Sequence, residues 1–275
     1  MTINGSFMAG KKGLIMGLAN KKSLAWGIAQ ALKDQGADLA FTYQGEALEK
    51  RVRPLADSLG FDFVTECDVS DQASIDHAFG EIEKRWGKLD FLVHSIGFSD
   101  KNELKGRYID TSPENFAITM NISCFSFTSV AKRAAALMGP GGSMITLSYY
   151  GAEKVVPHYN VMGVAKAALE ASVRYLAQDL GPDGIRVNSI SAGPIKTLAA
   201  SGVSDFRYLM KFNEINSPLK KNVTIEDVGN SALYLLSHLS NGVTGETHHV
   251  DAGYHIVGIP SEPLPAEFFP PKKED

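Results

Sequence analysis

Short apolar segments alternate along the chain with longer segments in which apolar residues recur every three or four positions. The short segments are typical of buried parallel strands, and the longer ones of helices that cover a sheet. The pattern therefore predicts an α/β fold, a single-domain, Rossmann-like, doubly wound parallel sheet of seven strands flanked by helices. The expected strands are residues 13–16, 38–43, 62–66, 91–94, 143–148, 186–191 and 246–250. The expected helices are residues 23–35, 46–59, 74–86, 113–137, 159–180 and 225–239.

Glycine and proline separate these elements without dividing the chain into independent domains. Gly36 and Gly60 follow the first two expected helices, and residues 139–142 read Gly-Pro-Gly-Gly before the fifth strand. We therefore expect one domain over residues 1–258. Residues 259–275 form a tail rich in proline and charge, which cannot bury enough apolar surface to fold alone and is expected to be mobile.

Composition and charge narrow the classes of function. The chain has 275 residues and 27 Lys and Arg against 31 Asp and Glu, a net charge of −4, which is unlike a protein that binds nucleic acid. No apolar run approaches the roughly 18 residues of a membrane span. Cys67 and Cys124 lack the spacing of a metal site or a disulfide framework, and the adjacent His248 and His249 would point to opposite sides of a strand. We therefore expect no metal, no membrane contact and a reducing compartment, the cytoplasm.

The turn after the first expected strand has features of a dinucleotide site. A strand, a glycine turn and a helix at the start of such a sheet usually bind a pyrophosphate at the free N–H groups of the helix. Here Gly17 opens the turn, and Ser23 is suited to cap the helix and to bind a phosphate oxygen through its hydroxyl. The turn is not G-x-G-x-x-G, and a capped turn is also common in α/β proteins that bind no nucleotide.

Two later strand ends support a nucleotide site. Asp68 and Val69 follow the third strand, where a carboxylate and an apolar side chain suit the amino group and the ring face of adenine. Residues 94–97, His-Ser-Ile-Gly, end the fourth strand in a small turn. These turns would converge with the first one, because ligands bind at the carboxyl ends of strands where the strand order reverses. Asp68 could instead cap a helix, and His94 is expected in the core.

The end of the second strand decides between two nicotinamide cofactors. An acid at this position favours the ribose hydroxyl of NAD, and an arginine favours the 2′-phosphate of NADP. Gln44 stands here and can bond to ribose hydroxyls, whereas Lys50, Arg51 and Arg53 lie a turn or more into the next helix. The sequence therefore favours NADH.

Tyr159 and Lys166 stand seven residues apart in the segment after the fifth strand. Seven residues is about two turns of helix, so both side chains would project from nearly the same face into the crevice. A lysine beside a cofactor ribose can hold its hydroxyls, and its charge makes a neighbouring tyrosine a better proton donor or oxyanion partner. The alternative is a tyrosine packed in the core and a lysine whose ammonium reaches solvent.

With these residues the chain resembles the short-chain dehydrogenase/reductase superfamily. Ordinary members carry Tyr-x3-Lys, but the residue four before Lys166 is Met162, whereas Tyr159 gives Tyr-x6-Lys. This is the form of the bacterial NADH-dependent enoyl-acyl carrier protein reductase branch, in which a second tyrosine also stands where Tyr149 does. The resemblance covers residues 13–258 and includes the segment 191–202.

The resemblance implies roles for further residues. Tyr149, Tyr159 and Lys166 would be catalytic, and residues from about 193 to 212 would form a lid over the substrate. The acyl substrate would contact Ser99, Tyr149, Tyr159, Met162 and Phe206, with Phe98, Val203 and Leu209 as further lining candidates. The cofactor would contact Gly17, Ser23, Leu24, Gln44, Asp68, Val69, Ser95, Ile96, Gly97, Lys166, Ile195, Lys196, Thr197, Leu198 and Ala199.

The resemblance also implies a reaction, the reduction of trans-2-enoyl-acyl carrier protein by NADH at the end of each fatty-acid elongation cycle. A physical reason supports the displaced tyrosine. Charge develops on a thioester oxygen about two bonds beyond the carbon that accepts hydride, so the donor should move along the helix by about a turn, roughly 5 Å. The family implies a homotetramer and an acidic carrier protein, which Arg207 and Lys211 could meet.

Two other functions remain open from the residues. A ketone or alcohol reductase of the same superfamily is opposed by Met162, which stands where its tyrosine should be. A nucleotide-sensing protein without catalysis is opposed by the presence of both Tyr159 and Lys166.

Overall fold

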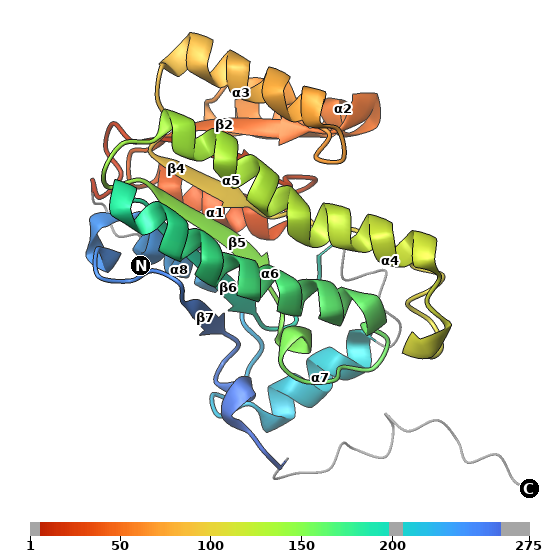
Figure 1. Ribbon diagram of the computed structural model, residues 1–275. Helices are drawn as coiled ribbons and strands as arrows, with labels where there is room; N and C mark the ends of the chain where they lie inside the picture. Colours follow the sequence, from red (N-terminus) through yellow and green to blue (C-terminus); the bar gives the residue numbers. More distant parts are fainter. Residues whose placement is uncertain (1–5, 198–205, 260–275) are drawn as a thin grey trace, which may run out of the picture.

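Seven parallel strands form one sheet in the order β3-β2-β1-β4-β5-β6-β7 (Figure 1). The computed structural model describes residues 6–197 and 206–259. The predicted fold class is confirmed. The strands are β1 (Lys12–Met16), β2 (Asp38–Tyr43), β3 (Val64–Glu66), β4 (Phe91–His94), β5 (Ser143–Ser148), β6 (Arg186–Ala192) and β7 (Thr247–Val250).

Helices cover both faces of the sheet (Figure 1). One core cluster joins the sheet to α1, α2 and α8, and a second joins its other face to α3, α5 and α6. Strands β1, β2, β4, β5 and β6 are almost wholly buried between these layers, as expected of parallel strands that are covered on both faces. The helices are α1 (Leu24–Lys33), α2 (Gly45–Leu59), α3 (Gln72–Trp86), α4 (Pro113–Met120), α5 (Ser126–Leu137), α6 (Asn160–Leu180), α7 (Phe206–Asn216) and α8 (Ile225–Leu236).

The strand order reverses between β1 and β4. β1 pairs with β2 on one side and with β4 on the other, so the chain leaves the centre of the sheet in one direction and later resumes in the other. The loops after these strands separate at this point and leave a crevice at the carboxyl ends of the strands. The predicted cofactor turns therefore lie at one edge of the sheet.

Three helical regions differ from the prediction. The helix expected over residues 113–137 is divided into α4 and α5 by a π-helical turn, Asn121–Phe125. α6 begins at Asn160, so Tyr159 is its N-cap residue and not part of its first turn. α7 was not expected as a helix, and the role of residues 193–212 as a lid stays a prediction.

Other features agree with the composition. Cys67 and Cys124 are free and buried, and burial raises the pKa of the Cys67 thiol to about 12. Among the described residues, no helix is long and apolar enough to cross a lipid bilayer. The cytoplasmic location stays a prediction.

Candidate active site

The first turn approaches the end of β4 very closely at Gly17. A Cβ atom on Gly17 would lie 1.9 Å from the carbonyl oxygen of Ser95, and its φ of +92° is one that side chains rarely adopt. Only glycine lets these two backbones approach so closely. The structure therefore brings Gly17 together with residues 95–97, as the sequence predicted.

Ser23 is the N-cap residue of α1, as predicted, but its hydroxyl does not make the expected cap hydrogen bond. Its hydroxyl oxygen accepts hydrogen bonds from the N–H groups of Ala19 (3.2 Å) and Asn20 (3.1 Å), and no side-chain cap bond is made. The hydroxyl closes the turn before the helix, because those two N–H groups point back at it. The first N–H groups of α1, beginning with Leu24, have no partner inside the helix and can face an anion.

Gln44 and Asp68 meet at the ends of β2 and β3. Gln44 Nε2 donates to Asp68 Oδ2 at 2.8 Å, and the backbone and hydroxyl of Ser70 donate to Asp68 Oδ1 at 2.8 and 2.6 Å. Burial opposes ionisation of Asp68, but the hydrogen bonds from Ser70 and Gln44 lower its pKa overall. Asp71, not Asp68, caps α3 by accepting from the N–H of Ala73. The Asp68 carboxylate is therefore available at the crevice, next to the buried Val69.

The charges near β2 disfavour a 2′-phosphate. Arg53 bonds to Glu49 at 2.7 Å, and Lys50 bonds to Glu46 at 2.6 Å. Glu66, which the sequence reading missed, accepts from the N–H of Gly45 at 3.2 Å. An acid at the end of β3 was visible in the sequence as the last residue of a strand. Its carboxylate adds negative charge where NADP would carry its extra phosphate.

Tyr159 lies against Tyr149 in the segment that joins β5 to α6. Their ring centroids are 5.0 Å apart at 75°, an edge-to-face contact. Burial first, then Tyr149 and Glu170, raise the pKa of Tyr159, and burial raises the pKa of Tyr149 to about 12. The expectation that Lys166 makes Tyr159 a stronger acid is therefore not met. Tyr159 stays protonated at neutral pH and can donate a hydrogen bond.

Lys166 is buried in the crevice, with 6% of its surface exposed. Its Nζ donates to the carbonyl oxygen of Leu147 at 2.8 Å. Burial lowers the pKa of this ammonium to about 8, so it is mainly charged at neutral pH. A Cβ atom built on Gly97 would lie 3.6 Å from Met162 Cε and 3.7 Å from Lys166 Nζ. Gly97, Met162 and Lys166 therefore surround the same small space.

An apolar cluster lies beside this space. Met162 packs with Leu104 and Val161, and Tyr159 packs against this cluster. Phe98 is 47% exposed, and Phe206 and Leu209 lie partly buried on α7. An acyl chain could enter between such side chains. The candidate Val203 lies outside the described residues.

The π-helical turn supplies a residue that the sequence reading missed. Ser123 Oγ lies 2.8 Å from the N–H of Phe98 and 2.9 Å from its carbonyl oxygen, so this hydroxyl fixes the loop after β4. Ser99, in the same loop, donates to Asn115 Oδ1 at 3.2 Å and accepts from Thr119 at 2.9 Å. No sequence signal reveals a π-helical turn, but a π-turn inside a helix often marks a functional site.

The other residues predicted to bind the cofactor, and His94, lie in different places: some beside the crevice and others away from it. Ser95 and Ile96 are partly buried after β4, and the Thr197 N–H donates to the Ile195 carbonyl at 2.8 Å. Lys196 is exposed. Leu198 and Ala199 lie outside the described residues. His94 is a core residue as expected, since Thr146 and Ser126 bond to its ring at 3.1 and 2.8 Å.

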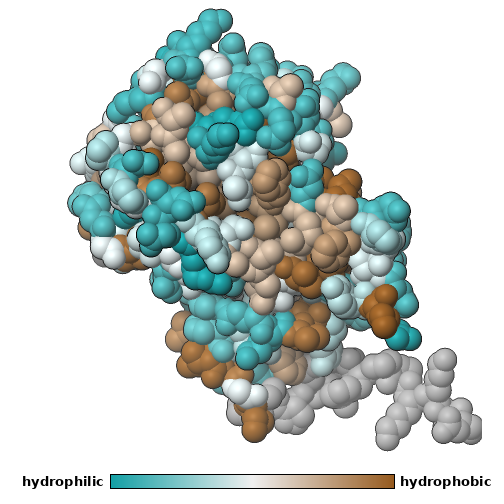
Figure 2. Space-filling view, in the orientation of Figure 1, coloured by the Kyte–Doolittle hydropathy of each residue, from teal (hydrophilic) through white to brown (hydrophobic). Residues whose placement is uncertain are grey.

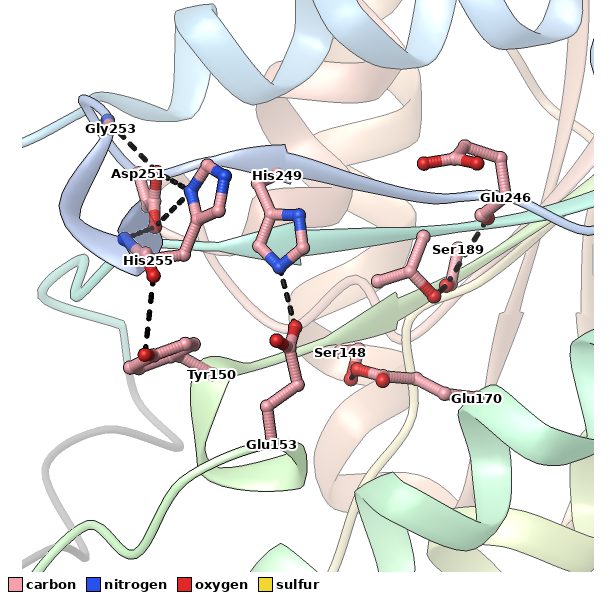
Figure 3. Close-up of polar contacts among 11 residues, drawn as sticks. Ser148, Tyr150, Glu153, Glu170, Ser189, Glu246, His249, Asp251, Gly253 and His255 are labelled. Carbon is pink, nitrogen blue, oxygen red and sulfur yellow. Dashed lines mark hydrogen bonds and ion pairs between the residues drawn. The ribbon is translucent and has the colours of Figure 1, made fainter. Parts of the chain in front are cut away.

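A polar network connects the active-site segment to β7 (Figure 3). His249 lies 2.6 Å from Glu153, and its ring stacks on His255 at 3.9 Å. His255 Nδ1 lies 3.0 Å from Asp251, and Tyr150 donates to the His255 carbonyl oxygen at 3.3 Å. No group of described His, Cys, Asp and Glu residues could hold a metal ion. The network therefore fixes the segment after Tyr149 by hydrogen bonds.

The chain is similar to known proteins over most of its length. Residues 17–255 match the family model described as Enoyl-(Acyl carrier protein) reductase. Over 258 residues the chain is 67% identical to enoyl-[acyl-carrier-protein] reductase [NADH] 1 of Rhizobium meliloti (strain 1021), covering 94% of this chain and 95% of that protein.

Two solved structures are similar throughout. The crystal structure of the enoyl-(acyl-carrier-protein) reductase of Anaplasma phagocytophilum in complex with NAD has a TM-score of 0.91 and 63% identity, covering 94% of this chain and 98% of that one. FabI from Candidatus Liberibacter asiaticus has a TM-score of 0.92 and 57% identity, covering 94% of this chain and 100% of that one. The chain therefore belongs to the enoyl-(acyl carrier protein) reductase family.

Proposed function

We propose that this chain reduces the double bond of trans-2-enoyl thioesters, carried on acyl carrier protein, to saturated acyl thioesters with NADH. This reaction is the last step of each fatty-acid elongation cycle. The observation that carries the proposal is the packing of Tyr159 against the apolar cluster that contains Met162, a residue that lies beside Gly97 and Lys166. The relatives described above are named for the same reaction.

The crevice fits a dinucleotide along its length. Asp68 can accept from the adenine amino group, and the amide oxygen of Gln44 is an acceptor for a ribose hydroxyl. The N-terminus of α1 faces the pyrophosphate position. Lys166 holds the nicotinamide ribose by donating to its hydroxyls. The bound NADH supplies a hydride to Cβ of the enoyl group, which places negative charge on the thioester oxygen.

Tyr159 stabilises this negative charge. Its phenol is neutral at neutral pH, because burial raises its pKa, and its proton can be donated to the developing oxyanion. The Lys166 ammonium adds positive potential in the same buried space. A proton that comes from water is then added at Cα of the enolate, which completes the reduction. Tyr149 forms part of the substrate wall through its contact with Tyr159.

Other residues complete the site in this proposal. Residues 95–97 and 195–197 contact the nicotinamide end of the cofactor. Ser99 approaches the thioester through its backbone, in a loop that Asn115 and Thr119 hold. Phe206, at the start of α7, contacts the acyl chain.

We also propose that the chain assembles as a homotetramer. Large apolar side chains are exposed on α4, on the π-helical turn and on α6, and Figure 2 shows a band of apolar surface over the region of α4, α5 and α6. Such a band is typical of an interface between proteins. These exposed residues are Phe116, Ile118, Phe125, Val164 and Tyr175. Light scattering of the eluted protein should give four times the chain mass of 29.7 kDa.

One assay tests the reaction. The absorbance of NADH is followed with a crotonyl thioester and then with an acetoacetyl thioester. Consumption with the first alone is the expected result. Consumption with the second alone would indicate a ketone reductase, and binding of NADH without consumption would indicate a nucleotide sensor.

A further inference from the structure

Glu170 is a buried acid next to the candidate catalytic lysine. It lies on α6 four residues after Lys166, so both side chains share one face of the helix. Only 7% of Glu170 and 6% of Lys166 are exposed. Burying a carboxylate costs free energy unless it is hydrogen-bonded or paired. The burial of Glu170 therefore costs free energy, which its hydrogen bonds and charge interactions must offset.

The partner of Glu170 is the last residue of β5. Ser148 Oγ donates a hydrogen bond to Glu170 Oε1, and Figure 3 shows the two side chains pointing toward each other. The preceding residue, Leu147, accepts from Lys166 Nζ at 2.8 Å. The following residue, Tyr149, contacts the ring of Tyr159. Glu170 and Lys166 thus hold consecutive residues of the strand end that leads to the tyrosine pair.

The charge of Glu170 also acts on Lys166. Burial lowers the pKa of Lys166, while the Cys124 thiol, facing it from the π-helical turn, and Glu170 both raise it. Burial raises the pKa of Glu170, and the hydrogen bond from Ser148 opposes that rise. The Glu170 carboxylate therefore favours the ammonium form of Lys166 across the helix face.

Other charged groups face Glu170 from the neighbouring elements. Glu153, at the end of the segment after β5, raises its pKa. His249 on β7 and Arg174 on α6 lower it. Glu170 raises the pKa of Tyr159 in turn. The carboxylate is therefore coupled to both of the residues that the proposed reaction uses.

We propose that Glu170 is a positioning residue for this reaction: bonded to Ser148 and one helical turn after Lys166, its carboxylate fixes the end of β5 next to Tyr149 and places an opposite charge near the Lys166 ammonium. The proposal rests on the role of Lys166 given under the proposed function. In this role Glu170 does not contact the substrate.

Titration of Lys166 in the protein without NADH tests the proposal. In protein labelled with carbon-13 lysine, the Cε resonance of Lys166 reports its ammonium, and its assignment follows from loss of the signal in Lys166→Gln. Glu170→Gln keeps the size of the side chain and an oxygen that accepts from Ser148, but it removes the charge. The Lys166 midpoint should then fall by about one pH unit, because an opposite charge that favoured the ammonium is lost.

Binding of NADH, followed by fluorescence against pH, gives a second measurement. In the parent protein the affinity should decrease as pH rises through the Lys166 midpoint, and in Glu170→Gln this decrease should begin at lower pH. Asp179→Asn is the matched control, because it removes one exposed acid from the same helix. The Lys166 midpoint in Asp179→Asn should equal that in the parent.

The outcomes separate this inference from the proposed function. If the NADH affinity of the parent protein does not follow the Lys166 titration, the proposed role of Lys166 is contradicted. If the NADH affinity of the parent does follow the Lys166 titration, but the Lys166 midpoint in Glu170→Gln equals that in the parent, the inference alone is overturned. If Glu170→Gln does not fold, Ser148→Ala decides: loss of the hydrogen bond should protonate Glu170 more readily and lower the Lys166 midpoint, and an unchanged midpoint overturns the inference.

Discussion

Tyr159 combines two properties that favour a hydrogen-bond donor over a strong acid. Its ring is held by Tyr149 and by Met162, and burial raises the pKa of its phenol. A group with this environment keeps its proton until negative charge develops next to it. The oxygen of an enolate provides that charge during reduction of an enoyl thioester.

Replacement of Tyr159 by phenylalanine should therefore affect the chemical step. Tyr159→Phe removes one hydroxyl and keeps the ring contact with Tyr149. We expect kcat with a crotonyl thioester to fall by about 10²–10³-fold, the usual loss for one donor to an oxyanion. The dissociation constant for NADH should stay the same, because Lys166 and not Tyr159 holds the ribose. A kcat equal to that of the parent would remove Tyr159 from the mechanism.

Single residues could be identified from the sequence when their spacing along the chain indicated a shared site. Tyr159 and Lys166 were singled out because a spacing of seven residues would bring two helical side chains to one face, although Tyr159 is the N-cap residue of α6 and lies outside the helix. Ser23 was assigned the wrong bond, because the nearest N–H groups depend on how the turn folds. Glu170 was overlooked although it breaks the apolar face of a helix, which is a readable sign of a buried acid.

At the scale of elements, the π-helical turn Asn121–Phe125 positions the loop after β4. The wider turn points Ser123 at the backbone of Phe98, where its hydroxyl contacts both the N–H and the carbonyl oxygen. This loop carries Gly97 and Ser99, which border the proposed sites of cofactor and substrate. A regular helix would direct the side chain elsewhere.

Ser123→Ala should loosen this loop. Loss of the hydroxyl leaves the Phe98 N–H without its partner, which typically costs about 1–3 kcal/mol. We expect a lower kcat/KM for the crotonyl thioester and a lower Tm. Ser58→Ala is a suitable control, because this exposed hydroxyl bonds only to a carbonyl of its own helix, Leu55. Equal kcat/KM values in the two variants would contradict a role for the π-turn.

The elements themselves were predictable to different extents. Strands such as β1 and β4 are mostly apolar and almost wholly buried, so apolar runs located them within a residue. α7 was missed because it buries Asn213 and Asn216, whose polar side chains hide the helical period. The Asn213 amide bonds to Asn222 at 3.1 Å, a partner that only the folded chain reveals.

At the scale of the whole molecule, the buried His94 links stability to pH. Burial lowers its pKa to about 3 in the folded protein, whereas in the unfolded chain it is about 6.5. Between these values the unfolded chain binds one more proton at this site than the folded chain does. The free energy of unfolding should therefore fall as pH decreases below about 6.5, by about 1 kcal/mol for each pH unit from this residue.

Urea unfolding at pH 7 and pH 5 measures this effect. His94→Asn should be less stable at pH 7, because the bonds to Thr146 and Ser126 are disturbed, but its stability should decrease less between the two pH values. If the parent and the variant lose the same free energy of unfolding over this interval, His94 is not the cause.

Docking of the carrier protein also belongs to this scale. Arg207 is exposed on α7, whereas Lys211 bonds to Glu214 at 3.2 Å, so Arg207 is the better candidate to meet an acidic carrier. Arg207→Glu should lower kcat/KM about tenfold for a carrier-bound substrate at low salt and leave a coenzyme A substrate unaffected. Lys132→Glu, an exposed cation on α5, is the control. Equal effects on both substrates would exclude docking at Arg207.

The strand order has a consequence for synthesis of the chain on the ribosome. β1, β2 and β3 are made first and are neighbours, so they can pair as soon as they emerge. The other edge of β1 stays unpaired until β4 (Phe91–His94) leaves the exit tunnel of the ribosome. Until then the nascent protein presents an open, apolar strand edge, which is prone to pairing with other chains. Once β4 is seated, its own outer edge stays open until β5 emerges, so chaperone binding to the growing polypeptide should persist over this interval and decline as the later strands pair.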